Sequence, residues 1–203
     1  MELDPRKTAV IAVHCQGDIM GPTGAFADFF HAEVESRDIV GKVAALLTSA
    51  RESGATVVYT RVAFKPDYSD LHANSPLLQI VQQAGCLKDG SELADIIEPL
   101  APSEADLVVT HQRIGGFTPD LIEILEHRGF DTVLFSGVAT NASVEGTARA
   151  ASDHGFRVGI IEDACSAATP EAHAASIGSL GLLAEITTSN ELHWVPAEAP
   201  AQA

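Results

Sequence analysis

Short apolar runs that alternate with helical patterns constrain the fold of this chain more than any other feature. Runs that read as strands occur at 8–14, 56–60, 106–110, 132–135, 157–161 and 185–188, and most of them are continuously apolar. Such strands, separated by helices, are typical of a parallel sheet covered on both faces. The pattern predicts a three-layer α/β/α fold with a central, mostly parallel six-stranded sheet.

Helical spacing and end signals locate the segments between the strands. A segment from about 32 to 52 has apolar residues at helical spacing and ends before Gly54, a typical C-cap residue. Further helices are expected at 119–127, from Asn141 onward and after Thr169. The segment 62–102 is the least regular part of the chain and contains several prolines.

Composition favours one acidic globular domain. With 203 residues, 46% of them hydrophobic and 20% charged, we expect a single domain over 1–203 with a Pro- and Ala-rich tail from about 191 to 203. The formal charge of −16 repels phosphate backbones and anionic lipids, so we expect no nucleic-acid partner and no membrane partner. The chain has neither a signal-peptide pattern nor a clustered cysteine motif, and a reduced, cytoplasmic setting is the default expectation.

Three side chains with reactive potential fall at one edge of the expected sheet. His14 ends the first strand, His111 follows the third, and Ser143 follows the fourth at the start of an Ala-rich helix. Ligands of open parallel sheets bind outside the carboxyl ends of the strands, and a helix start suits a nucleophile or an anion. Each residue alone is more often structural, as a hydrogen-bonded histidine or a capping serine. Their coincidence favours a functional site.

Three blocks of the sequence resemble the isochorismatase-like hydrolases, also called the cysteine hydrolase superfamily, over about residues 6–190. They are TAVIAVHCQGD (8–18), DLVVTHQRIGGFTPDLIEIL (106–125) and SGVATNASVEGTARAASDHGFRVGIIEDACS (136–166). The third block is long and specific, whereas the first two are weaker alone. The resemblance implies the three-layer fold, a small-molecule substrate and a homo-oligomer, either a dimer or a tetramer.

The departures from the family pattern fall on its catalytic positions. Hydrolytic members use an Asp, a Lys and a Cys, and the matching positions here are His14, His111 and Ser143. In the usual set the carboxylate takes the thiol proton, the ammonium keeps the thiolate charged, and the thiolate attacks a carbonyl. A serine instead needs a base, which neutral His111 or His14 can supply while the other imidazole polarises the substrate or orients the first.

Other residues are expected to complete this site. Asp18 matches the second Asp of the family's first block and is the nearest carboxylate that could orient a histidine. Arg61, just after the second strand, suits a substrate carboxylate, although a surface ion pair is an equal alternative. Phe64 and Phe117 are candidate pocket walls, with plain packing as the alternative, and Phe117 matches the family's loop aromatic.

The resemblance also implies an oxyanion hole. Backbone N–H groups around Ala139 and Ser143 would form it, with an unusual cis peptide near Val138–Ala139. Such a hole depends on the backbone, so it survives a change of nucleophile.

A metal centre is the weaker interpretation of the same edge. The two histidines, with Asp18 as a third ligand, could hold zinc. Nicotinamidase-type members bind metal through Asp-x-His just after the second strand, but the matching positions here are Val62 and Phe64. Asp70 and His72 do spell Asp-x-His, but further along, in a loop bounded by prolines, and are expected to be surface residues. We therefore expect no metal and no cofactor.

Two classes of function remain. One is a hydrolase of a small amide, carbamoyl or ester-type substrate, with Ser143 as nucleophile and His111 and His14 as base and polarising group. The other is a catalytically silent member that binds a small ligand or serves as a structural subunit. Two imidazoles at these positions favour the hydrolase, because random decay more often leaves small residues. The loss of every usual catalytic identity favours the silent member, and fold alone does not decide.

Overall fold

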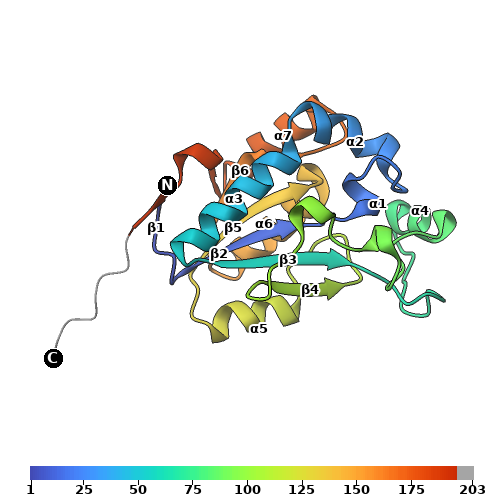
Figure 1. The fold of residues 1–203 in the computed structure, drawn as a ribbon, viewed down its shortest axis with the longest axis horizontal. Helices are drawn as coiled ribbons and strands as arrows, with labels where there is room; N and C mark the ends of the chain where they lie inside the picture. The colour runs from blue at the N-terminus through green and yellow to red at the C-terminus, as the bar shows by residue number, and fades with distance from the viewer. Residues whose placement is uncertain (196–203) are drawn as a thin grey trace.

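A six-stranded sheet forms the centre of the molecule (Figure 1). The computed structural model describes residues 1–195. The strands lie in the order β4-β3-β2-β5-β6-β7, and every neighbouring pair is parallel. Their bounds are β2 Thr8–Val13, β3 Thr56–Val62, β4 Leu107–His111, β5 Thr132–Val138, β6 Arg157–Ser166 and β7 Glu185–Thr187. The predicted three-layer α/β/α fold is confirmed.

Helices cover both faces of the sheet and build two apolar cores. On one face, α3 (Ile39–Ser53) buries Val43 and Leu47 in the same core as Val10 of β2. On the other, α5 (Pro119–His127) and α6 (Glu145–Asp153) share a core with Ile11 of β2. Neighbouring residues of a strand point to opposite faces of the sheet. Because helices cover both faces, every residue of β2 is buried, as in a central parallel strand.

The remaining elements complete the layers and the sheet edges. These are α1 Gly17–Met20, α2 Ala27–Ser36, α4 Pro76–Ala84 and α7 Pro170–Leu180, the short helices η1 Glu92–Ala94, η2 Glu98–Leu100, η3 Thr140–Val144 and η4 Ser189–Glu191, and the strands β1 Glu2–Leu3 and β8 His193–Trp194. The arrows of β2 and β3 in Figure 1 point toward the side where α1 and α4 lie. No helix of the described residues is long and apolar enough to cross a bilayer.

One sequence-based expectation about element bounds needs correction. The single helix expected from about 32 to 52 is two helices, α2 and α3. The first helix ends before Asp38, which adopts a left-handed conformation with φ 51°. Within the tail expected from about 191, β8 pairs in parallel with β1. Residues 196–203 of that tail lie outside the described residues.

The chain adds strands first on one side of β2 and then on the other, starting with β5. The site lies where β2 and β5 meet. From β2 the chain adds β3 and β4 on one side, then returns to place β5 on the other. Ligands of such sheets bind in the crevice at the carboxyl ends of the two strands that flank the reversal. His14 directly follows β2, and η3, which carries Ser143, closely follows β5.

Gly137 allows the close approach of β2 and β5 beneath this crevice. Its φ is 115°, and a Cβ at this position would overlap the carbonyl oxygen of Val13. We expect Gly137→Ala to lower the free energy of unfolding by more than about 2 kcal/mol, because strain and overpacking add. Gly178→Ala is the control, since open space surrounds Gly178 in α7, and its effect should stay within about 1 kcal/mol. Urea unfolding of both variants measures the difference, and equal stabilities would contradict the expectation.

Candidate functional site

His14 leaves the carboxyl end of β2 through a sharp change of backbone direction. It has a left-handed φ of 52°, which is uncommon for a residue other than glycine. Its N–H donates to Thr60 O of β3 at 3.0 Å, and its carbonyl accepts from Gln16 N at 2.8 Å. The side chain is buried, at 2% exposure. The end of β3 therefore holds the turn that carries this imidazole.

His111 ends β4, and its imidazole reaches His14 although β3 lies between their strands. The two Nε2 atoms are 3.1 Å apart, a hydrogen bond between buried rings. The ring centroids are 5.1 Å apart with an interplanar angle of 34°. The sequence-based expectation that these two side chains meet at one edge agrees with this geometry.

Burial keeps this imidazole pair neutral at physiological pH. Desolvation, and then the neighbouring His111, hold the pKa of His14 well below its usual value. Desolvation lowers the pKa of His111 to about 4. Charging either ring would require taking an ion out of water beside a second imidazole.

The hydrogen bonds of the pair also assign its protons. Arg113 N donates to His111 Nδ1 at 3.3 Å, so this nitrogen carries the lone pair. Neutral His111 therefore holds its proton on Nε2 and donates it to His14 Nε2. Neutral His14 then holds its own proton on Nδ1, which has no described partner. The resting pair thus offers an N–H donor, and no free lone pair, at His14.

Ser143 lies in η3, a π-type turn between β5 and α6. The peptide bond Val138–Ala139 that precedes this turn is cis, as the family resemblance implies. The N–H groups of Thr140 and Asn141 donate to no described backbone group, as at any helix start. Ser143 is buried, at 7% exposure, and its hydroxyl forms no hydrogen bond with the described residues.

Hydrogen bonds from two sides fix the turn that carries Ser143. Thr147 Oγ1 donates to Ser143 O at 2.5 Å and accepts from Gly116 N, of the loop after His111, at 2.8 Å. At the other end, Thr140 Oγ1 bonds His173 Nδ1 of α7 at 2.9 Å. The loop of one imidazole and the turn of the serine are therefore parts of one hydrogen-bonded network.

An apolar pocket opens onto His14 and Ser143. Its cavity volume is about 50 Å³, room for about three or four water molecules. The polar residues of its wall are His14, Ser143 and Arg113. Apolar side chains and backbone form the rest: Ile19, Phe26, Phe30, Val62, Leu77, Leu78, Val81, Leu87, Ile114, Val138, Ala139 and Ala142. His111 contacts His14 through the Nε2 atoms and does not line the pocket.

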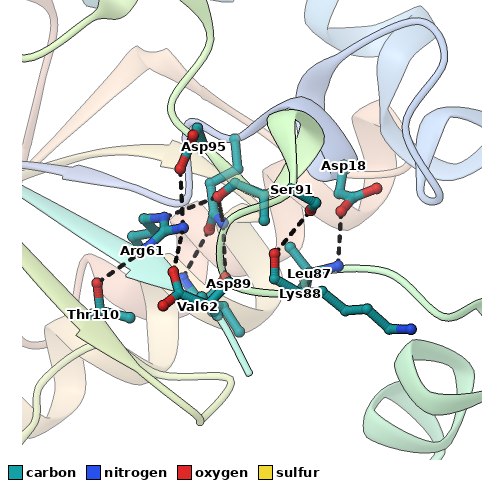
Figure 2. A network of polar contacts seen from close by, with 12 residues as sticks. Asp18, Arg61, Val62, Leu87, Lys88, Asp89, Ser91, Asp95 and Thr110 are labelled. Atoms are coloured by element: carbon teal, nitrogen blue, oxygen red, sulfur yellow. Dashed lines mark hydrogen bonds and ion pairs between the residues drawn. The ribbon is translucent and has the colours of Figure 1, made fainter. Parts of the chain in front are cut away.

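Asp18 and Arg61, two residues expected in the site, instead tie loops together (Figure 2). Asp18 Oδ2 accepts from Leu87 N at 2.7 Å, and it bonds neither imidazole. The Arg61 guanidinium forms ion pairs with Asp89 and Asp95, each at 2.9 Å. Neither residue lines the pocket. Of the two alternatives weighed for Arg61, the observed contacts match the ion pair.

The two aromatic candidates pack away from the pocket wall, whereas Ala139 belongs to it. Phe64 is fully buried and contacts Tyr68, with ring centroids 6.2 Å apart. Phe117 packs on Phe156 and His154 in the second core, with centroid distances of 5.8 and 5.4 Å. Ala139 lines the pocket beside the turn that carries Ser143.

Sequence reasoning missed two residues that matter for the site. Gln16 ties the end of β2 to β3 and η1, because its amide bonds both backbone groups of Val62 and the carbonyl of Ala94. Arg113 lines the pocket and fixes the His111 tautomer. The signal for Arg113 was present, since it follows His111 by two residues at the same edge of the sheet.

The described residues contain no group of three or more His, Cys, Asp or Glu side chains that could hold a metal ion. Cys15, Cys86 and Cys165 are buried, and none lines the pocket. Desolvation raises the pKa of Cys15 and of Cys86 to about 12, and that of Cys165 further. A thiol of that kind is a poor nucleophile.

Comparison with known proteins agrees with this fold. The isochorismatase domain model matches residues 8–191. The chain therefore belongs to the isochorismatase family. Among its relatives is the isochorismatase family protein YecD of Escherichia coli O157:H7, 31% identical over 89% of this chain and 90% of that protein.

Two further comparisons relate the chain to hydrolases. The ureidoacrylate amidohydrolase RutB of Methylobacterium radiotolerans is 27% identical, over 99% of this chain and 85% of that protein. The crystal structure of a cysteine hydrolase from Pseudomonas syringae pv. phaseolicola 1448A superposes with a TM-score of 0.84 and 29% identity, over 93% of this chain and 92% of that one.

The buried imidazole pair makes stability sensitive to acid. An unfolded histidine has a pKa of about 6.5, whereas burial lowers the folded pKa of His14 and brings that of His111 to about 4. Between these values the unfolded state binds more protons. The free energy of unfolding should therefore fall as the pH drops from about 6.5 toward 4, and stay level above that window.

His111→Gln should reduce the slope of the free energy of unfolding against pH, by up to the contribution of about one bound proton. Urea unfolding at several pH values measures the slope, and His127→Gln, which removes an exposed histidine of α5, is the control. An unchanged slope in His111→Gln would show that the pair is not neutral in the folded state.

Proposed function

We propose that this protein hydrolyses a small amide, carbamoyl or ester-type substrate, with Ser143 as the nucleophile and the imidazole pair as base and polarising group. The observation that carries the proposal is that Ser143 and His14 share one apolar pocket at the crevice between β2 and β5. Neither Ser143 Oγ nor His14 Nδ1 forms a hydrogen bond with the described residues. The amidohydrolase among the relatives supports cleavage of a C–N bond.

The roles of the two histidines follow from their positions. His14 lines the pocket, so it is the group that contacts the substrate or the serine. His111 lies behind it and acts through the bond between the Nε2 atoms. In a serine–histidine system a third group orients the imidazole, and here His111 takes that place instead of a carboxylate.

General base catalysis requires the opposite tautomer from the resting one. His14 must present a lone pair at Nδ1, which places its proton on Nε2 as a donor to His111 Nε2. His111 then carries its proton on Nδ1, so the Arg113 N–H must move off that atom. This contact is long, at 3.3 Å, and breaking it costs little. Solvent carries the proton from one Nδ1 to the other.

The reaction then proceeds in two balanced halves. Ser143 Oγ bonds to the substrate carbonyl carbon while its proton passes to His14 Nδ1. The leaving amine or alcohol takes that proton as its bond to the carbon breaks, and an acyl-serine remains. Water repeats the cycle, giving its proton to His14 and its oxygen to the carbonyl carbon. The acid product leaves with the serine restored. Ala139 and Ser143 both line the pocket, so the backbone N–H groups around them are the candidates for oxyanion stabilisation.

A specific observation favours the second candidate, a silent member that binds a small ligand. The resting pair has no free lone pair facing the pocket, and Ser143 Oγ bonds neither imidazole. In that case His14 Nδ1–H serves only as a donor to a ligand carbonyl. The two candidates differ in turnover, which the next experiment measures.

Ser143→Ala should lower turnover by at least about a thousandfold, because the attacking atom is lost. The measurement uses a panel of small p-nitrophenyl esters, primary amides and carbamoyl compounds. Stability should stay within about 1 kcal/mol of the wild type. Ser136→Ala is the matched control, since this buried hydroxyl of β5 has no partner and lies outside the pocket. Equal turnover in wild type and Ser143→Ala would remove Ser143 from the mechanism.

The pH profile provides an independent test of the base. The active form is the neutral pair, and burial lowers the pKa of both imidazoles, that of His111 to about 4. We expect kcat/KM to stay level from pH 8 to about 5.5 and to fall toward pH 4 as the pair is protonated. A loss of activity centred near about pH 6.5, the usual histidine value, would point to a different, solvated base.

A further inference from the structure

Arg113 carries a positive charge at the pocket without a carboxylate partner. Its side chain is exposed, and its described contact is from NH1 to the carbonyl of Gln112 at 3.3 Å. No described Asp or Glu forms an ion pair with it. Arg61, by contrast, is paired with two carboxylates. On a chain with a formal charge of −16, an arginine without an ion pair in a pocket wall is a distinctive feature.

The backbone holds Arg113 in a defined place relative to the reacting groups. Its N–H donates to His111 Nδ1, and the preceding residue, Gln112, donates from Nε2 to Ala63 O at 3.1 Å. Gly116, further along the same loop, is bonded to Thr147. The guanidinium therefore starts from a loop that is tied to β3, to the imidazole pair and to the nucleophile turn.

We propose that Arg113 binds the carboxylate of the substrate and so determines specificity. The substrate class is a small amide or ester that bears a carboxylate, separated from the scissile carbonyl by a short apolar segment. The carbonyl meets Ser143 and His14, the apolar segment meets the aliphatic wall, and the carboxylate meets the guanidinium fork. The inference rests on the proposed function, because that function supplies the scissile carbonyl.

A carboxylate fits these surroundings better than a phosphate group. The cavity is small, about 50 Å³, and Arg113 is the single cation of its wall. A guanidinium binds a carboxylate through two parallel hydrogen bonds, which matches one donor fork to one charge. A phosphate carries more charge and more acceptors than one arginine and a neutral imidazole satisfy.

The test is binding of matched probes to the Ser143→Ala protein, so that it does not depend on turnover. The anionic probes are malonamate, succinamate and glutaramate, and the neutral ones are the corresponding diamides. We expect at least one anionic probe to bind about ten- to a hundredfold tighter than its diamide in calorimetry. The preference should weaken as salt screens the exposed guanidinium.

Variants identify the residue responsible. Arg113→Gln should abolish the preference for the anion, and Arg113→Lys should keep only part of it, because an ammonium lacks the planar fork. Arg128→Gln removes an equal charge from the exposed end of α5, outside the pocket, and should leave the preference intact. Thermal unfolding of each variant verifies that it is folded.

Three outcomes would overturn the proposal: no probe binds the Ser143→Ala protein, anion and diamide bind equally, or the preference persists in Arg113→Gln. A wild-type protein that binds succinamate through Arg113 but hydrolyses no probe would instead reject the proposed hydrolase and keep the anion site. The two conclusions can thus fail separately.

Discussion

Two neutral imidazoles meet at the carboxyl edge of the sheet, and the chemistry of the pocket depends on the hydrogen bond between them. The bond forms because β2 and β4 run in parallel on either side of β3, so that His14 and His111 leave the sheet at the same edge. The two imidazoles stay neutral because both rings are buried. A charged ring here would repel a second charge and attract any anion without discrimination, whereas a neutral pair can donate or accept according to its tautomer.

The backbone around this bond is held by amides and hydroxyls. The Gln16 amide closes the ends of β2 and β3, and Thr147 joins the Ser143 turn to the loop after β4. Neutral partners of this kind fix geometry without adding a net charge, and Arg113 is the one charged side chain in the pocket wall. The acidic surface of the chain then makes this arginine the favourable place for an anion at the pocket.

Sequence patterns predicted the fold and the meeting of the two imidazoles, because both follow from strand order and direction. They did not predict the partners of long polar side chains. Arg61 was equally compatible with a ligand or an ion pair until the chain brought Asp89 and Asp95 beside it, about thirty residues later in sequence. The break at Asp38 was hidden because the buried apolar positions at helical spacing all lie in α3, so they do not locate the start of the helix. The roles of His14, His111 and Ser143 remain predictions, since contacts alone do not measure turnover.

The two tautomers of the pair suit successive stages of the proposed reaction. A lone pair on His14 Nδ1 is needed when Ser143 attacks, and an N–H at the same atom is needed once negative charge develops on the carbonyl oxygen or the leaving group must be protonated. The resting structure holds the donor form, which is fixed by the hydrogen bond from Arg113 N–H to His111 Nδ1. The residue that would bind the substrate carboxylate is therefore also the one whose backbone selects the tautomer. In the proposed reaction, release of that N–H from His111 Nδ1 separates the base form of the pair from the donor form, which would serve a silent binder.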